Sequence, residues 1–465
     1  MGKFFGTDGI RQTAEKFTAD FIQKIVAGLL DYAEENRGLR EGAIKVLIGG
    51  DTRESTEWMI RDFEKALEGA GAEHRNIGVF PTPGINHVFY EMGFDFAIDI
   101  TASHNPYQDN GVKIFERGER LGLKKGVKLS SEGVQKIEKR LSADDVGKVT
   151  AVNWEEDISA EAKELYLAHL RDYVESIRPV SAGAERRVDL SNLKIGMDFA
   201  NGAMSKIGAE LFESLGAEIK KIHQDEHFGQ KINADCGSTS LGSLKRLVQE
   251  EGLDFGVAFD GDGDRCLLVD ESGEEVDGDQ IIALVAEYLE LKQLVTTVMV
   301  NQGLLTWAKE RSVGVEITNV GDQNVAARMR EKQILLGGEQ SGHVILPNET
   351  MGDGMLTALV VCKILSEAKR EGKKVAEMFL RKTPQTLAAL EVNKEEKLKF
   401  EQMGVEVQGF LTKWTERLES ANERLLVRAS GTQNIIRISI WGEDLQKIKD
   451  ETDQIAEQLK LILKD

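Results

Sequence analysis

Cysteine, proline and positive charge are all scarce in this sequence. Its 465 residues include only three cysteines, which lie far apart and form no CxxC pair, so neither a disulfide framework nor a zinc knuckle is indicated. Only six prolines accompany a hydrophobic content of 41%, which is typical of a well-packed globular protein. The 59 basic residues are outnumbered by 79 acidic ones, giving a net charge of −20. This balance argues against nucleic acid as a partner, because phosphate backbones require a basic surface.

Long hydrophobic runs are missing as well. The opening residues, MGKFFGTDGIRQ, contain no apolar signal-peptide core, and no stretch approaches the length of a membrane span. We therefore expect a cytoplasmic protein without membrane contact. Anionic small molecules stay compatible with the charge, since a local cationic pocket can form on an acidic surface.

Strand and helix patterns alternate along most of the chain. An apolar strand at 43–49 precedes an amphipathic helix at 57–71, another strand is expected at 94–100, and the alternation continues to a helix at 353–371. Beyond an expected linker at 382–384 the pattern changes. There the sequence predicts strands at 386–392 and 425–440 and helices at 395–416 and 443–463. Three α/β units followed by one α+β unit are therefore expected.

A serine and a histidine stand side by side in TASHNP, a turn-rich loop after the expected strand 94–100. The pair suggests a hydrolase dyad. Adjacent residues of an extended chain point to opposite sides, however, so His104 is not expected to take a proton from Ser103. We expect Ser103 to face solvent and to serve another purpose.

Three aspartates alternate with glycines in DGDGDR, residues 260–265. Oxygen ligands at this spacing suit a hard cation, and without one Asp260, Asp262 and Asp264 would repel one another. A solvated acidic turn is the simpler alternative. An EF-hand is excluded, since its sixth position requires glycine where this chain has Arg265.

Two further loops have the composition of ligand-binding turns. The segment RASGT at 428–432, with Arg437 beyond it, combines guanidinium groups, hydroxyls and backbone N–H groups suited to phosphate. The loop GGEQSGH at 337–343 presents a carboxylate, an amide and a hydroxyl that could bind sugar hydroxyls. For each loop an ordinary structural turn is an open alternative.

One motif points to a different chemistry. HQDEH at 223–227 matches the H-x-x-E-H pattern of inverted zinc proteases. That chemistry places both histidines on one face of a helix, whereas the preceding AEIKKI is strand-like and Gly229 follows closely. We therefore expect surface histidines in a loop, with a zinc protease as the minor alternative.

In combination these loops resemble the α-D-phosphohexomutase superfamily. FGTDGIR at 5–11, TASHNP, DGDGDR, GGEQSGH and RASGT occur in that superfamily's order across nearly the whole chain. The opening motif, YQDNG at 107–111, INADCGST at 232–239 and Gln340 are most similar to the phosphoglucosamine mutases. The resemblance implies an α/β fold of four domains, three α/β/α domains plus a C-terminal α+β domain, around a central cleft. Its domains would span 1–155, 156–256, 257–375 with the metal-binding loop at 257–270, and 376–465.

The same resemblance implies a mutase mechanism. Ser103 would carry a phosphoryl group as phosphoserine, donate it to a hexose phosphate to give a 1,6-bisphosphate intermediate, and take back the other phosphoryl group of that intermediate. Mg²⁺ would be held by Asp260, Asp262, Asp264 and the phosphorylated Ser103. Lys113 would transfer protons, which requires a depressed pKa. The other residues implied are Arg11, His104 and His343 in the catalytic centre, Glu339 and Ser341 at the sugar, and Arg428, Ser430, Gly431, Thr432 and Arg437 at the phosphate.

Several positions depart from the family pattern. The usual SGTEP reads SGTQN here, with Gln433 and Asn434, while Ala429 replaces a proline and Gln323 replaces the arginine of VGDR. These changes bear on substrate identity more than on reaction type, and we expect interconversion of glucosamine 6-phosphate and glucosamine 1-phosphate. The alternatives are a phosphomannomutase/phosphoglucomutase and a catalytically silent sugar-phosphate-binding protein. A homodimer is compatible with the resemblance, although the sequence does not determine the oligomeric state.

Overall fold

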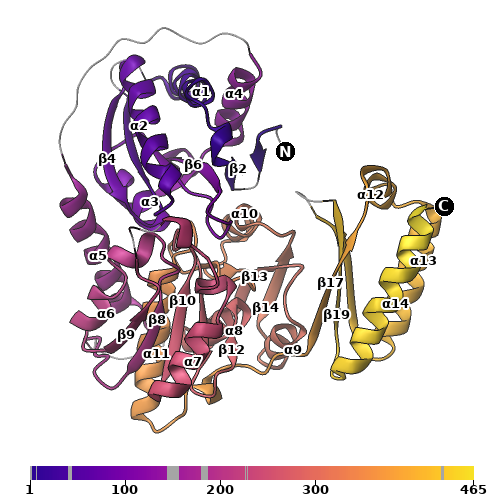
Figure 1. Cartoon of the computed structure of the whole chain (residues 1–465). Helices are drawn as coiled ribbons and strands as arrows, with labels where there is room; N and C mark the ends of the chain where they lie inside the picture. The colour runs from indigo at the N-terminus through magenta and orange to yellow at the C-terminus, as the bar shows by residue number, and fades with distance from the viewer. Residues whose placement is uncertain are drawn as a thin grey trace. The chain divides into compact units, whose positions relative to one another are not determined.

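The computed structural model describes residues 3–464 apart from residue 7, 40–43, 144–156, 180–186, 226, 228 and 431–433. The chain divides into two compact units. The first joins Met1–Thr297 with Thr318–Phe379, and the second joins Val298–Ile317 with Leu380–Asp465. Three sheets lie in the first unit, and a further sheet lies in the second (Figure 1).

The first sheet has seven strands in the order β1–β2–β6–β5–β3–β4, with β7 paired to β6. They are β1 (Phe5–Gly6), β2 (Gly9–Thr13), β3 (Lys45–Gly50), β4 (Glu73–Val79), β5 (Phe96–Ile100), β6 (Asp109–Arg117) and β7 (Gly126–Lys128). Strand β3 is parallel to β4 and β5, whereas β6 is antiparallel to β2, β5 and β7. The turn that follows β5 and the middle of β6 therefore lie near each other, because these neighbouring strands run in opposite directions.

Helices cover both faces of this sheet. Helices α1 (Ala19–Arg37), α2 (Glu54–Gly69) and α4 (Ser131–Leu141) share one hydrophobic core with the strands. Helix α3 (Thr82–Glu91) packs on the opposite face, where Ile85 lies against Gly49. Because neither face meets water, β3 and β5 are almost continuously apolar instead of alternating.

The second sheet has the strand order β12–β11–β10–β8–β9. Its strands are β8 (Lys194–Asp198), β9 (Glu218–Ile222), β10 (Phe255–Phe259), β11 (Cys266–Asp270) and β12 (Glu275–Val276), with helices α5 (Ser159–Ser176), α6 (Glu210–Ser214) and α7 (Gly242–Glu251) in the same part of the chain. Strands β10 and β11 pair antiparallel, so the aspartate loop is the connection between them. By strand pairing this loop belongs to the second sheet, and the domain boundary expected between 256 and 257 falls inside β10.

The third sheet of the first unit contains β13 (Gln293–Thr297), β15 (Gly337–Gly338) and β16 (Val344–Ile345). Helices α8 (Gly278–Tyr288), α10 (Asp322–Lys332) and α11 (Gly354–Arg370) accompany it. The loop GGEQSGH is the turn between β15 and β16. Helix α11 is buried along most of its length. Even so, no helix of the described residues is long and apolar enough to cross a membrane.

The second unit is built on an antiparallel sheet in the order β17–β19–β18. The helices and strands of this unit are α9 (Gln302–Glu310), nearly all of β14 (Gly314–Thr318), β17 (Gln385–Glu391), α12 (Lys394–Glu401), α13 (Val405–Glu419), β18 (Arg424–Ala429), β19 (Ile435–Trp441) and α14 (Leu445–Lys464). Helices α13 and α14 cover one face of the sheet (Figure 1). The single helix expected at 395–416 is wrong, because the extended backbone of Gly404 separates α12 from α13.

Candidate active site

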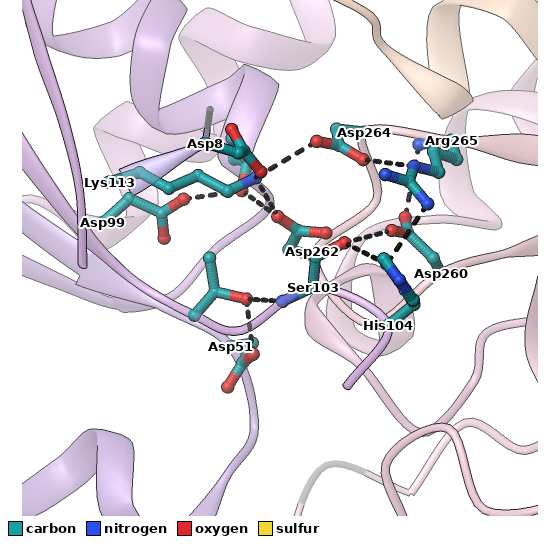
Figure 2. Close-up of polar contacts among 12 residues, drawn as sticks. Asp8, Asp51, Asp99, Ser103, His104, Lys113, Asp260, Asp262, Asp264 and Arg265 are labelled. Carbon is teal, nitrogen blue, oxygen red and sulfur yellow. Dashed lines mark hydrogen bonds and ion pairs between the residues drawn. The ribbon is translucent and has the colours of Figure 1, made fainter. Parts of the chain in front are cut away.

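Three segments of the first unit converge on one buried centre (Figure 2). The turn after β5 carries Ser103, the connection between β10 and β11 carries three aspartates, and β6 carries Lys113. Ser103 Oγ donates a hydrogen bond to Asp260 Oδ2 at 2.8 Å. Lys113 Nζ lies 2.6 Å from Asp262 Oδ2 and 3.1 Å from Asp264 Oδ2. Motifs that are far apart in the sequence therefore form a single site.

The backbone of Ser103 is not extended, because its φ of 52° lies in the left-handed region. The turn brings the next ring back toward the hydroxyl, and Ser103 Oγ lies 3.3 Å from His104 Nδ1. The expectation that His104 points away from Ser103 is therefore wrong. Ser103 is also fully buried instead of facing solvent. A non-glycine residue in this conformation costs about 1–3 kcal/mol, so surrounding contacts must maintain it.

Asp51 and Arg53, directly after β3, support this strained turn, and the motif analysis missed them. Thr101 Oγ1 donates to Asp51 Oδ2 at 2.6 Å and accepts from the N–H of Ser103 at 2.8 Å. The carbonyl oxygen of Ser103 accepts from Arg53 Nη2 at 3.1 Å and from Asn233 Nδ2 at 2.9 Å. A charged pair immediately after a buried strand is the sequence signal that could have identified Asp51 and Arg53, since such residues are seldom buried without a purpose.

Asp260, Asp262 and Asp264 are all buried, and their carboxylates offer ligand atoms within 4.8 Å of one another. Oδ1 of Asp262 and Oδ1 of Asp264 accept no hydrogen bond in the described part of the chain, although Arg265 Nε lies 3.6 Å from Asp264 Oδ1. Buried carboxylate oxygens that accept no hydrogen bond are suited to a hard cation, which would offset the cost of burying them. The loop also requires glycine, since a Cβ on Gly261 would lie 2.6 Å from the carbonyl oxygen of Ser103. This aspartate triad could bind a metal ion.

The three carboxyl groups of the triad differ in pKa. Burial raises the pKa of Asp260 well above its usual value, and the charges of Asp262 and Asp264 add to the effect. Burial acts in the same direction on the other two, but Lys113 outweighs it. The pKa of Asp262 is lowered, and that of Asp264 is held well below its usual value. A cation among the three would favour ionisation of all of them.

Lys113 is 2% exposed and is surrounded by carboxylates. Asp8 Oδ2 lies 3.3 Å from Nζ, in addition to the contacts with Asp262 and Asp264. Burial would lower the pKa of Lys113, but these three neighbours raise it well above its usual value. The depressed pKa expected for this lysine is therefore wrong for this arrangement, and Lys113 is held as an ammonium ion.

His104 is a neutral imidazole in this arrangement. Burial lowers its pKa to about 4, and the nearby charges of Arg265 and Arg11 act in the same direction. Arg265 Nη1 donates to His104 Nδ1 at 3.1 Å. Since arginine can only donate, Nδ1 is an acceptor and faces the hydroxyl of Ser103 without a proton of its own.

A chain of ionic groups runs from the first sheet to the third. Lys128, at the end of β7, forms ion pairs with Asp8 and with Asp322 at the start of α10. Beyond this ionic pair of contacts, Asp322 Oδ2 lies 3.7 Å from His343 Nε2, which accepts from the N–H of Gly352 at 2.9 Å, and His343 Nδ1 lies 3.7 Å from Asp264 Oδ2. The chain thus ends at the aspartate triad. The motif analysis identified His343 but not the contributions of Asp8, Lys128 and Asp322.

The residues expected at the sugar differ in their surroundings. Glu339 Oε1 accepts from the N–H of Gly321 at 2.9 Å, so this carboxylate is fixed in orientation. Gln340 Nε2 donates to Asp277 Oδ2 at 3.3 Å, at the N-terminus of α8. Ser341 is exposed. In this loop the fixed carboxylate of Glu339 and the accessible hydroxyl of Ser341 are therefore only two residues apart in the sequence.

Comparisons with known proteins agree on one family. Residues 2–147, 171–273 and 277–384 match the phosphoglucomutase/phosphomannomutase alpha/beta/alpha domains I, II and III, respectively. A phosphoglucosamine mutase from Caldicellulosiruptor saccharolyticus is 38% identical over 98% of each chain, and one from Clostridium tetani is 35% identical over 100% of this chain and 99% of the relative. The chain belongs to the phosphoglucosamine mutase family. It is thus a phosphosugar mutase, an isomerase of carbohydrate metabolism.

Solved structures support the fold. A phosphoglucomutase/phosphomannomutase family protein from Burkholderia thailandensis has a TM-score of 0.71 at 22% identity, covering 98% of this chain and 97% of that one. The N-acetylphosphoglucosamine mutase of Aspergillus fumigatus, solved with GlcNAc-6P and magnesium, has a TM-score of 0.64 at 16% identity over 98% and 95% of the two chains. The expected superfamily and the four-domain fold class are confirmed. The relatives also favour phosphoglucosamine mutase over the phosphomannomutase/phosphoglucomutase alternative.

The residues expected at the phosphate belong to the second unit. Arg428 on β18 is directly opposite Arg437 on β19, so both side chains project from the same face of the sheet. Ser430 is buried at the end of this hairpin, and its N–H donates to the carbonyl of Ile435 at 2.9 Å. The expected partners Gly431 and Thr432 lie outside the described residues.

The described residues of the HQDEH motif, 223–225 and 227, are not helical. Strand β9 ends at Ile222, just before the motif, and His223 follows in a loop. His227 is exposed, as expected, but His223 is only partly exposed, and its Nδ1 lies 3.0 Å from Asp198 Oδ2. Since no helix is found among these described residues, they lack the helical face on which the zinc-protease alternative would place its two histidines.

Proposed function

We propose that this phosphosugar mutase interconverts glucosamine 6-phosphate and glucosamine 1-phosphate through a phosphoserine and a 1,6-bisphosphate intermediate. The observation that carries the mechanism is the buried Ser103 hydroxyl, 2.8 Å from Asp260 Oδ2 in the aspartate triad. The names of the full-length relatives support glucosamine phosphate as the substrate. The fold, with its three α/β/α domains, is shared with other hexose-phosphate mutases and does not itself choose the sugar.

The reaction requires two phosphoryl transfers at Ser103. In the first, the bond between Oγ and phosphorus breaks, the free hydroxyl of the hexose phosphate bonds to phosphorus, and its proton is transferred to the released Oγ. In the second, Oγ bonds to the other phosphorus of the bisphosphate, the bond between that phosphorus and the sugar oxygen breaks, and the Ser103 proton is transferred to the released sugar oxygen. His104 Nδ1 lies 3.3 Å from Oγ, but it accepts from Arg265 Nη1 while the Ser103 hydroxyl donates to Asp260. His104 would therefore help to position this turn in the catalytic centre and would not take the proton.

Charge neutralisation is the main task of the other residues in this proposal. Phosphoryl transfer has little covalent chemistry for a protein to perform, so positioning and electrostatics dominate. The raised pKa of Lys113 supports a role as an ammonium ion that stabilises the transferring group, not as a free base. Arg11, ion-paired to Asp8, and His343, beside Asp264, would complete the catalytic centre.

Mg²⁺ is the ion that we propose for the aspartate triad. Asp260, Asp262, Asp264 and the phosphorylated Ser103 would hold it, because all their donors are hard oxygens. The oxygens of Asp262 and Asp264 that accept no hydrogen bond in the described residues support this assignment. When bound, the ion neutralises negative charge on the phosphoryl group.

The hexose phosphate would be held by two further groups of residues. Glu339 and Ser341 would bind sugar hydroxyls. Arg428 and Arg437 would bind the phosphate that does not react, together with Ser430, Gly431 and Thr432. Two guanidinium groups on one face of this hairpin offer several donors suited to phosphate oxygens, which supports the proposal.

Competition kinetics test the choice of substrate. We expect kcat/KM for glucosamine 6-phosphate to exceed the values for glucose 6-phosphate and mannose 6-phosphate, each measured with catalytic amounts of its bisphosphate. A higher kcat/KM for mannose or glucose phosphate would instead support the phosphomannomutase/phosphoglucomutase alternative. The side chain of Gln340 is hydrogen-bonded to Asp277. Gln340→Ala should therefore change the preference for glucosamine 6-phosphate less than Glu339→Gln does.

Two further expectations accompany this function. We predict a homodimer, which size-exclusion chromatography with light scattering would detect as twice the mass of the chain. We also predict a cytoplasmic location, which fractionation of the source cells would check.

A further inference from the structure

A second group of metal-ligating side chains lies at the edge of the second sheet, apart from the aspartate triad. Asp198 ends β8, His223 follows β9, and Cys236 lies just before a short 3-10 helix, Gly237–Thr239. One ligand atom from each residue lies within 4.8 Å of the others. The closest pair is His223 Nδ1 and Asp198 Oδ2, at 3.0 Å.

The topology of the sheet explains why these residues meet. Strands β8 and β9 are parallel, and Asp198 is paired with Ile222, so the next residue reaches the same edge of the sheet. His223 has a φ of 47°, and its carbonyl accepts from the N–H of Asn201 at 2.6 Å. This turn directs the imidazole back to Asp198 instead of continuing the strand.

The donor set identifies the kind of ion. We propose that Asp198, His223 and Cys236 bind Zn²⁺, with the fourth position open to water. A carboxylate, an imidazole and a thiolate match the mixed ligands of zinc, whereas Mg²⁺ avoids sulfur. Asp198 and Cys236 are fully buried, and the side chain of His223, 30% exposed, provides access from solvent.

The spacing is close to what such an ion requires. Tetrahedral zinc with bonds of about 2.0 Å to nitrogen and about 2.3 Å to sulfur separates its ligand atoms by roughly 3.3–3.8 Å. The nitrogen–oxygen separation of 3.0 Å is near this range, and the upper limit of 4.8 Å for the remaining pairs requires only a small rotation of side chains. Cys236 Sγ also lies 3.8 Å from the carbonyl oxygen of Lys231 and 3.9 Å from Asn201 Nδ2, and both contacts help to fix its position.

The site would be linked to the turn that carries Ser103. Asn233, three residues before Cys236, donates from Nδ2 to the carbonyl of Ser103 at 2.9 Å. On the other side, Thr52 Oγ1 donates to the carbonyl of Asn201 at 2.5 Å. Zinc would therefore connect the segment that contacts Ser103 to the edge of the second sheet, and binding should raise the melting temperature of the protein.

Cobalt spectroscopy separates this site from the aspartate triad. The full chain, stripped of metal and then saturated with Mg²⁺, is titrated with Co²⁺ and afterwards with Zn²⁺. We expect thiolate-to-cobalt charge-transfer absorption that saturates at one ion per chain and disappears when Zn²⁺ is added. Only a cysteine ligand produces this absorption, so carboxylate binding at the triad is silent in the assay.

Matched variants assign the ligands. Cys236→Ser should abolish the absorption, and His223→Gln, at a partly exposed position that tolerates change, should weaken Zn²⁺ binding by more than about tenfold. Cys362→Ser is the control, because this cysteine is equally buried in α11 but belongs to neither group of ligands among the described residues. Absence of the absorption in the unmodified protein, its persistence in Cys236→Ser, or unchanged Zn²⁺ affinity in His223→Gln would each overturn the proposal.

Discussion

Replacing Lys128 by methionine would break the chain of ionic groups between the first and third sheets. Methionine retains the apolar length of the side chain but removes the ammonium ion shared by Asp8 and Asp322. All three groups are largely shielded from water, with side-chain exposures of 17% for Lys128, 17% for Asp8 and 12% for Asp322. Removing one partner of a buried ion pair costs about 3–5 kcal/mol. Allowing for partial screening by solvent, we expect the free energy of unfolding to fall by about 2–3 kcal/mol.

The pH dependence of this loss follows from the pKa of Lys128. Burial would lower that pKa, but Asp322 and Asp8 raise it above 10.5. A group whose pKa is higher in the folded state contributes fully below its unfolded value and loses its contribution as the pH rises through the folded value. The difference between the two proteins should therefore be constant at neutral pH and shrink only in strongly alkaline solution.

Urea denaturation measures the loss, and two more variants define its origin. Lys65→Met is the control, because Lys65 is 72% exposed and pairs with Asp62 on the surface at 3.1 Å. It should cost no more than about 0.5 kcal/mol. Adding Asp322→Asn to Lys128→Met removes one of the two unpaired carboxylates and should restore roughly 1 kcal/mol. If Lys128→Met is no less stable than Lys65→Met, the ionic chain does not stabilise the fold and the reasoning fails.

Three other changes have defined outcomes. Ser103→Ala should reduce turnover by more than about a thousandfold but should cost only about 1–2 kcal/mol of stability, since one hydrogen bond to Asp260 is lost. The intact mass of this variant should show no phosphate. Appreciable turnover by the variant would contradict the phosphoserine mechanism. EDTA should abolish turnover and Mg²⁺ should restore it, whereas an unaffected rate would disprove metal dependence. Burial is the main cause that lowers the pKa values of the stacked His87 and His169 from 6.5 to about 3 and about 4. Because the unfolded chain then binds more protons than the folded one, stability should decline as the pH falls below 6.5. His87→Phe should flatten this decline. An unchanged slope would show that the buried histidine pair does not cause it.

Short-range features of the sequence were sufficient for most elements and for the chemical loops. The aspartates that alternate with glycines at 260–265 predicted a cation loop, and in the structure they directly follow β10 at Phe255–Phe259 and form the aspartate triad. Such patterns are informative because burial recurs at the period of a strand or helix, and because loops that bind ions concentrate polar groups. The same reasoning failed at Gly404, where one helical pattern conceals two helices.

The surroundings of each side chain in the site could not be predicted from short-range patterns in the sequence. Lys113 and Asp262 are 149 residues apart in the chain but 2.6 Å apart in space, and no local pattern records that contact. The pKa of Lys113 depends on those carboxylates, which is why burial alone suggested the wrong direction. The orientation of His104 depends on the left-handed backbone of Ser103, which is supported by Arg53 and Asn233 from other parts of the fold. Electrostatic and steric effects of this kind act through distance in space, so they exist only once the strands have paired and the loops have met.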